Sequence, residues 1–155
     1  MLNQFFDIMV NIIFKNHGIL DKFVGDQLMA VFGLIPSENN TSYNAIHAAI
    51  EMQNATKELM KIRAKEDKDT FEIGIGINTG SAIVGNLGSE NRMDYTAIGN
   101  SVNVAAKLQQ IAKGGKIIIG EQTYRQSQGN FHIEKKVKLR LKNKIEPVIC
   151  YEVSR

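Results

Sequence analysis

Residues 20–33, Leu-Asp-Lys-Phe-Val-Gly-Asp-Gln-Leu-Met-Ala-Val-Phe-Gly, predict a β-hairpin around which the rest of the chain can be arranged. Two apolar runs, Phe23–Val24 and Leu28–Phe32, flank a turn at Gly25–Asp26. Gly25 can adopt the positive φ that a tight hairpin turn requires. The carboxylate of Asp26, at the tip of this hairpin, is well placed to hold a hard cation. A second interpretation stays open, because aspartate is also a common turn former.

The length and composition indicate one globular domain. The chain has 155 residues, of which 43% are hydrophobic, and this is enough for a sizeable core. The net charge of +3 is mild. Much of it lies near the C-terminus, at Lys135, Lys136, Lys138, Arg140, Lys142 and Lys144. Alternating charge on a strand is typical of a solvated face, so we expect no nucleic acid as a partner.

Cysteine content and hydropathy indicate a cytoplasmic protein. The single cysteine, Cys150, allows no intramolecular disulfide and fits a reducing compartment. No apolar stretch approaches the roughly 20 residues of a membrane span. The N-terminal residues have helical spacing and no basic leader, unlike a secretory signal. We expect a cytosolic domain, free or part of a larger protein, with any membrane contact made through segments absent from this chain.

Helices and strands are expected to alternate along the chain. Apolar residues recur at helical spacing near the N-terminus and again from Ala45 to Leu59. The other expected elements are a strand at 71–78 that turns into a partner strand at 82–84, a glycine-containing loop at 85–94, a helix at 101–111, a strand at 116–119, a short helix at 121–127 and a C-terminal hairpin turning near 142–144. This pattern predicts an α+β domain, with a mixed sheet and helices packed on one face.

A second informative stretch runs from Gly99 to Leu108. Asn103 and Lys107 are four residues apart, so they project from one face of the expected helix. Val102, Ala105 and Ala106 are expected to point the other way, into the core. An amide beside an ammonium suits a polyanionic or ribose-bearing ligand, although an ordinary solvent-exposed helix face has the same pattern.

Several segments occur in the order found in class III nucleotidyl cyclases. They are Gly18–Asp26, Gly74–Gly80, Val84–Ser89, Arg92–Gly99 and Ser101–Ala106. From Leu2 to Val153 the chain resembles the catalytic domain of bacterial adenylate cyclases of that class. The resemblance implies a ferredoxin-like βαββαβ-type fold. It also implies a head-to-tail homodimer with active sites at the interface, each built from both chains.

The resemblance further implies a reaction and its cofactors. In the family, ATP is converted to 3′,5′-cyclic AMP and pyrophosphate for cyclic-nucleotide signalling. The ribose 3′-hydroxyl attacks the α-phosphate with the help of two divalent ions, Mg²⁺ or Mn²⁺. Two aspartates of one subunit hold these ions, and Asp26 matches the second of them.

Residues that match the family's substrate contacts are spread along the chain. Lys22 and Thr96 match the positions that recognise the base. Lysine is only a donor and suits N1 of adenine, and Thr96 can accept from the 6-amino group. Guanylate cyclases of the family carry Glu and Cys there, so this pair favours ATP. Asn103 matches the residue that orients the ribose, and Lys142 a phosphate-binding lysine.

The chain departs from the family pattern at its N-terminus. The family's first metal-binding aspartate lies on a strand before the first helix, so residues 1–155 are expected to form an N-terminally truncated catalytic domain that lacks this strand. Asp7, in Phe5-Phe6-Asp7-Ile8, is not a replacement. It is too close to Asp26, no Gly-Phe follows it, and the surrounding pattern is helical.

Two further departures concern the catalytic residues. Lys107 stands where the family usually has the arginine that stabilises transition-state charge, and a point charge does not replace a planar bidentate fork. Asn143 stands where a glycine usually follows the phosphate-binding lysine. These departures keep a second hypothesis open, that of a catalytically silent cyclase-like module that dimerises or binds nucleotide. We expect the truncated chain alone to have weak activity or none.

Overall fold

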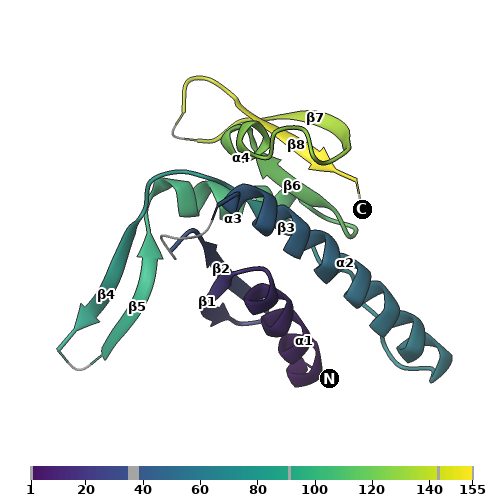
Figure 1. Ribbon diagram of the computed structural model, residues 1–155. Helices are drawn as coiled ribbons and strands as arrows, with labels where there is room; N and C mark the ends of the chain where they lie inside the picture. The colour runs from purple at the N-terminus through teal and green to yellow at the C-terminus, as the bar shows by residue number, and fades with distance from the viewer. Residues whose placement is uncertain (1, 35–38, 91, 143, 155) are drawn as a thin grey trace.

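The computed structural model describes residues 2–34, 39–90, 92–142 and 144–154 (Figure 1). Helices and strands alternate along these residues. The elements are α1 (Leu2–Lys15), β1 (Gly18–Val24), β2 (Gln27–Phe32), α2 (Thr41–Lys65), β3 (Ile75–Ile77), β4 (Ile83–Ser89), β5 (Arg92–Ile98), α3 (Asn100–Ile111), β6 (Ile117–Gly120), α4 (Glu121–Gln126), β7 (Ile133–Leu139) and β8 (Val148–Val153).

Over the described residues, the strands form one four-stranded sheet and two separate hairpins. The sheet has the order β3-β6-β8-β7, with β3 parallel to β6 and the other neighbours antiparallel. β1 pairs with β2, and β4 pairs with β5, both antiparallel. The α+β class and the mixed sheet are confirmed. None of the helices in the described part of the chain has the length and apolar character needed to cross a membrane.

The helices cover both faces of the four-stranded sheet, so the prediction of helices on one face was wrong. Ile117 and Ile119 of β6 lie in a core cluster with Ile46 of α2. Ile118, between them, lies in a second cluster with Leu108 of α3. Successive side chains of a strand point to opposite faces. An apolar run without alternation therefore needs a helix on each side of the sheet.

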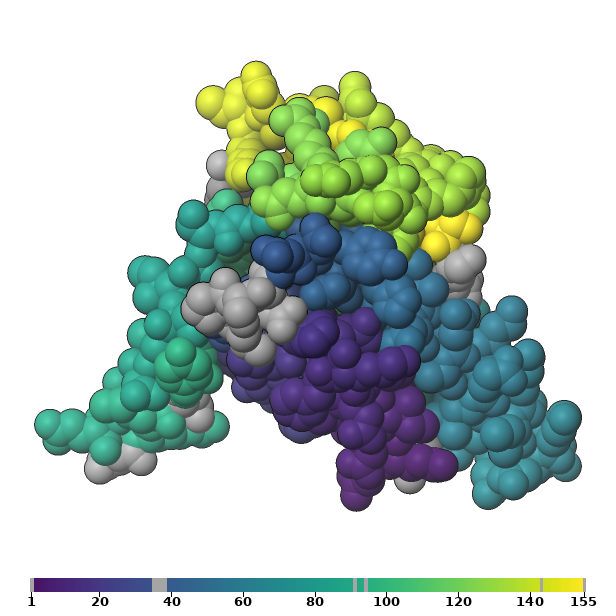
Figure 2. All heavy atoms as spheres, viewed as in Figure 1, coloured from purple at the N-terminus to yellow at the C-terminus, as the bar shows by residue number. Residues whose placement is uncertain are grey.

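The second hairpin is not where the sequence predicts it. β3 is short and pairs with β6, whereas the expected partner strand at 82–84 is the start of β4. β4 and β5 pair without a register shift from Ile83–Ile98 to Ser89–Arg92, across the residues expected to form a loop. Glycines lower the intrinsic preference for a strand, but cross-strand pairing decides. This hairpin extends away from the rest of the molecule (Figures 1 and 2).

A separate core forms between α1, α2 and the β1–β2 hairpin. Phe5, Met9 and Ile13 line the buried face of α1 and pack with Met52 and Leu59 of α2. The apolar positions of α1 recur at helical spacing, as the sequence predicts, because only one stripe of this helix meets the core. This packing holds the hairpin that carries Asp26 against the body of the domain.

A network of polar side chains joins the end of α1 to α2. The Asn16 Nδ2 atom donates to Ile12 O at 2.9 Å and to Glu51 Oε2 at 2.7 Å, and Asn16 Oδ1 lies 2.9 Å from His47 Nδ1. Lys15 Nζ lies 2.6 Å from the other oxygen of Glu51. The hydrogen bond from Lys15, with that from Asn16, holds the pKa of Glu51 below its ordinary value of 4.5.

The backbone of the α3 region packs directly against the region of β3 because two positions there, Gly74 and Gly76, are glycine. A Cβ built at Gly74 would collide with the carbonyl group of Ala112. A Cβ at Gly76 would collide with the backbone of Gln109 and of Ala105. The obstacles are main-chain atoms of the helix, which cannot move aside as a flexible side chain can. The glycines therefore set the distance between α3 and the sheet.

We expect Gly76→Ala to destabilise the domain. The added methyl group must push α3 off β3, and overpacking of this kind costs about 1–3 kcal/mol or more of unfolding free energy. Urea unfolding followed by circular dichroism measures the change. Gly85→Ala is the matched control, because a Cβ at Gly85 meets nothing within 4 Å. Equal midpoints for the two variants would contradict the packing argument.

The ion pair at Glu51 predicts a pH-dependent contribution to stability. A carboxyl group whose pKa is lower in the folded state stabilises the protein above its unfolded pKa, and this stabilisation is lost as the pH falls through the folded pKa. Glu51→Gln should cost about 1 kcal/mol at pH 7. The difference from the parent should shrink below pH 4.5.

Thermal unfolding of both proteins between pH 7 and pH 3 measures this difference. Glu58→Gln is the control, since the Glu58–Lys61 pair lies on the exposed face of α2. A difference between parent and Glu51→Gln that does not change with pH would exclude the ionic contribution.

Candidate active site

The β1–β2 hairpin places Asp26 at an exposed turn. Gly25 has a φ of 63° in this turn, and its position is open, so conformation rather than crowding requires glycine there. Among the described residues, Asp26 has no hydrogen-bond or ion-pair partner for its side chain. The turn predicted from the sequence is confirmed, and it leaves the carboxylate free to meet a ligand.

Lys22 and Thr96 are far apart in the sequence but meet at one carboxylate oxygen. The Thr96 hydroxyl donates to Asp21 Oδ2 at 2.7 Å, and Lys22 Nζ lies 3.5 Å from the same oxygen. The other oxygen of Asp21 accepts from the backbone N–H of Ala97 at 3.1 Å. The Asp21 side chain is 5% exposed. Asp21 thus joins β1 to β5 and gathers the two side chains that the resemblance assigns to the base.

A β-bulge accounts for the direction of Asp21. Leu20 pairs with Ala30 and Lys22 pairs with Met29, so Asp21 is an extra residue between two ladder pairs. A bulge interrupts the regular alternation of side chains and re-aims one of them. The role of Asp21 was missed in the sequence analysis. Its signal was a carboxylate next to Lys22 in a strand that is otherwise apolar, but the bulge itself leaves no mark in the sequence.

Asn103 and Lys107 lie on the exposed face of α3, as predicted. Lys107 Nζ lies 3.2 Å from Gln110 Oε1 on the same helix. The buried residues of α3 are Val104 and Leu108, which pack toward β6 and β8. Ala106 is exposed, so its predicted inward direction was wrong, while Val102 and Ala105 are half-buried. The inward stripe is shifted because Val104 and Leu108, rather than Val102 and Ala106, meet the sheet.

Lys142 follows β7 in the C-terminal hairpin and is exposed. Its neighbour Asn143 lies outside the described residues. A cavity of about 400 Å³ lies nearby, lined by residues that include Gly80, Asn100, Glu121 and Lys144. The candidate site residues Lys22, Asp26, Thr96, Asn103, Lys107 and Lys142 do not line it. The structure therefore brings together Lys22 with Thr96, and Asn103 with Lys107, while Asp26 and Lys142 stand apart on exposed turns.

Comparison with known proteins decides the family. Residues 1–154 match the family described as the adenylate and guanylate cyclase catalytic domain. The chain belongs to this family. It is 35% identical to an adenylate cyclase of Anabaena cylindrica, covering 98% of this chain and 31% of that protein. It is also 35% identical to the terminal-differentiation-specific adenylate cyclase of Dictyostelium discoideum, covering 98% of this chain and 7% of that protein.

Solved cyclase structures share the fold of this cyclase domain. The adenylyl cyclase CyaB from P. aeruginosa matches with a TM-score of 0.93 and 34% identity, over 99% of this chain and 80% of that chain. The guanylyl cyclase Cya2 matches with a TM-score of 0.90 and 30% identity, over 98% of this chain and 77% of that chain. The family and fold expected from the sequence are confirmed, while the curated relatives are much longer than this domain.

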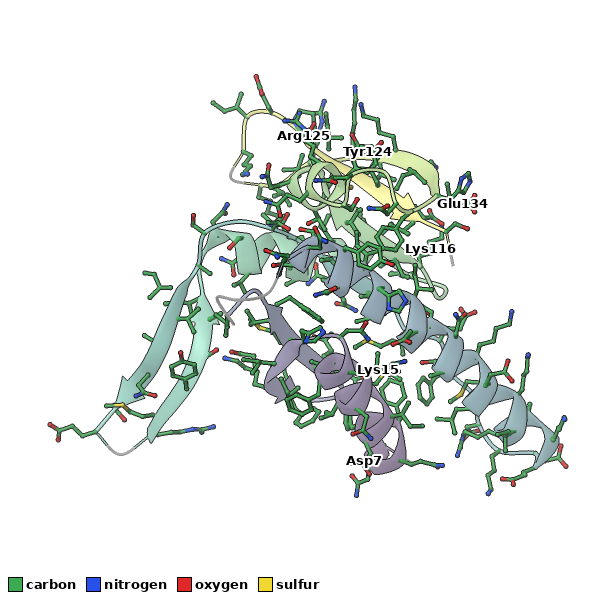
Figure 3. All side chains as sticks on the ribbon, in the orientation of Figure 1. Asp7, Lys15, Lys116, Tyr124, Arg125 and Glu134 are labelled. Atoms are coloured by element: carbon green, nitrogen blue, oxygen red, sulfur yellow. The ribbon has the colours of Figure 1, made fainter. Side chains whose placement is uncertain are left out.

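The described side chains of this cyclase domain offer a divalent ion one candidate ligand, Asp26, rather than a complete binding site. Carboxylate oxygen is the ligand that Mg²⁺ and Mn²⁺ prefer, and Asp26 offers it on an exposed turn. In the part of the chain that the structure describes, His, Cys, Asp and Glu side chains form no cluster of three or more that could hold a metal. Asp26 would be one ligand of such an ion, and nucleotide phosphates and water could supply others. Asp7 projects from the exposed side of α1 (Figure 3).

We expect Asp26→Asn to weaken Mn²⁺-dependent nucleotide binding by about tenfold or more, because it removes a charged ligand. Stability should stay within about 0.5 kcal/mol, since the side chain is exposed and makes no described contact. Titration calorimetry with Mn²⁺ and a non-hydrolysable ATP analogue measures the affinity. Asp7→Asn removes an exposed carboxylate elsewhere and should bind like the parent. Equal affinity for both variants would show that Asp26 is only a turn former.

Proposed function

We propose that this domain converts ATP into 3′,5′-cyclic AMP and pyrophosphate in cyclic-nucleotide signalling. The observation that carries the proposal is the meeting of Lys22 and Thr96 at Asp21. The solved neighbours include adenylyl and guanylyl cyclases, so the shared fold does not select the nucleotide. Selection must come from side chains, and a lysine with a threonine supports adenine, which presents an acceptor at N1 and a donor at its 6-amino group.

The chemistry assigned to the site is an intramolecular phosphoryl transfer. A bond forms between the ribose 3′-oxygen and the α-phosphorus, the bond from that phosphorus to the pyrophosphate oxygen breaks, and the hydroxyl proton is released. Asn103 orients the ribose, Lys107 places positive charge near the phosphate that reacts, and Lys142 binds the phosphates that leave. A divalent ion held by Asp26, when bound, lowers the pKa of the ribose hydroxyl and neutralises charge on the leaving group.

The proposed active unit is a homodimer, with the base-reading residues from one chain and the metal-binding residues from the other. The β4–β5 hairpin supports this arrangement, because it extends from the body (Figure 2) and exposes large apolar side chains. Ile83 is 68% exposed, and Met93 and Tyr95 are each 63% exposed. Met93 and Tyr95 are two residues apart on β5 and so share one face of the hairpin. Exposed apolar groups on a projecting element are typical of a protein–protein interface.

A silent cyclase-like module is the second candidate, and Lys107 is the observation that favours it. A lysine keeps the charge of the family's arginine but not its planar pair of donors. Removing one preorganised donor costs about 10²–10³ in rate, and lysine should lose less than that. The proposed reaction is therefore slow rather than absent.

Cyclic AMP production tests the proposal. The natural full-length protein that carries this domain, supplied with Mn²⁺ and ATP or GTP, should form cyclic AMP in preference to cyclic GMP. Lys107→Arg should raise the turnover number by about tenfold while leaving the stability unchanged, because it restores the bidentate donor on an exposed helix face.

Lys113→Arg is the matched control, a lysine-to-arginine change just beyond α3 that should leave turnover unchanged. Full-length protein that binds ATP and forms no cyclic nucleotide, with or without Lys107→Arg, would establish the silent module instead.

A further inference from the structure

The buried carboxylate of Asp21 contacts both side chains, Lys22 and Thr96, that recognise the base in the proposed function. Asp21 Oδ2 accepts from the Thr96 hydroxyl at 2.7 Å and lies 3.5 Å from Lys22 Nζ. Asp21 Oδ1 accepts from the Ala97 backbone N–H at 3.1 Å. Both carboxylate oxygens are therefore engaged, and the side chain is 5% exposed. A buried carboxylate that is fully bonded in this way holds its partners in one arrangement.

The Thr96 hydroxyl has one proton, and it donates that proton in a hydrogen bond to Asp21. An ionised carboxylate can only accept hydrogen bonds, so the hydroxyl must be the donor in this pair. Thr96 is 5% exposed, so water cannot easily compete for the proton. The lone pairs that remain on Thr96 make it an acceptor toward any ligand. A free threonine hydroxyl would instead turn to donate or to accept as the ligand required.

The surroundings leave room for a ligand on this side of β5. Thr96 pairs with Gly85 across the β4–β5 hairpin. Paired residues of an antiparallel ladder point to the same face. Gly85 has no side chain, and a Cβ built there would meet nothing within 4 Å. The position on β4 that faces Thr96 is therefore open, while Asp21 contacts Thr96 from β1.

We propose that Asp21 is a positioning residue that sets the hydrogen-bonding polarity of the base site. It makes Thr96 an acceptor and keeps Lys22, a donor, beside it. One acceptor and one donor match the 6-amino group and N1 of adenine. Guanine presents the opposite pattern, an acceptor at its 6-oxo group and a donor at N1. The inference rests on the proposed function, because it names how that same site chooses its purine.

A purely structural role for Asp21 makes a different prediction. On that reading the carboxylate only ties β1 to β5, and its loss loosens the sheet edge without changing which base fits. Affinities for ATP and GTP would then fall together. A change in the ratio of the two affinities therefore distinguishes a residue that sets the hydrogen-bonding pattern of the base site from one that only joins β1 to β5.

Asp21→Asn is the test variant, made in the natural full-length protein. The amide that this change introduces can still accept from Ala97 through its oxygen, but its NH₂ group faces Thr96 and donates to it. The hydroxyl proton is then released toward the ligand, where it suits the 6-oxo group of guanine. We expect the ratio of ATP affinity to GTP affinity to fall by about tenfold, because adenine loses one hydrogen bond with Thr96 and guanine gains one.

The measurement is equilibrium binding of both nucleotides with Mn²⁺, followed by kcat/KM where turnover occurs. Thr96→Val is the matched background, because it removes the hydroxyl and keeps the shape of the side chain. In that background Asp21→Asn should lower the ratio clearly less than it does in the parent, since the hydroxyl is gone and only the contact of Asp21 with Lys22 is left to change. Thr96→Ser should keep most of the parent ratio, because serine retains the hydroxyl.

Three results would overturn the inference. These are an unchanged ratio in Asp21→Asn, an equal fall of the ratio in the parent and Thr96→Val backgrounds, and a parent protein that binds ATP and GTP equally. Failure of the proposed function is a separate result. If the parent protein prefers ATP but makes no cyclic AMP, the catalytic proposal is wrong. The ratio of ATP affinity to GTP affinity in the parent and in Asp21→Asn still tests the role of Asp21.

Discussion

The burial of β6 on both faces is the constraint on which the rest of the structure depends. Every residue of Ile117–Gly120 is buried. The strand pairs with β3 on one side and with β8 on the other. α2 and α4 must cover one face and α3 the other, because an apolar strand that alternates between two faces needs two covers. The position of α3 follows from this, and with it the direction of Asn103 and Lys107.

Hydrogen bonds between polar side chains hold α4 in place near the end of the sheet. Thr123 of α4 is fully buried and its hydroxyl lies 2.8 Å from that of Thr79, just beyond β3. Ser42 of α2 donates to Gln126 at 2.7 Å. The stacked rings of Tyr124 and Tyr151 join α4 to β8, with centroids 4.2 Å apart. Polar and aromatic contacts thus fasten the short helix that caps the central strand.

The candidate site is built on elements outside this buried centre. Asp26 and Lys142 lie on exposed turns, and Thr96 lies on a hairpin that projects from the body. A single carboxylate, Asp21, ties the first hairpin to the second. An open arrangement of this kind suits a site completed by a second chain, because each half contributes groups that a monomer leaves uncovered.

The sequence by itself determined the family, the order of most elements, the turn at Gly25–Asp26 and the shared face of Asn103 with Lys107. These features depend on local spacing and on residue type, which can be read along the chain. Only the tertiary structure decided the pairing of β4 with β5, the cover on both faces of β6 and the role of Asp21. Strand partners are chosen across long stretches of chain, and a bulge depends on the register of two strands, so neither is encoded in local spacing.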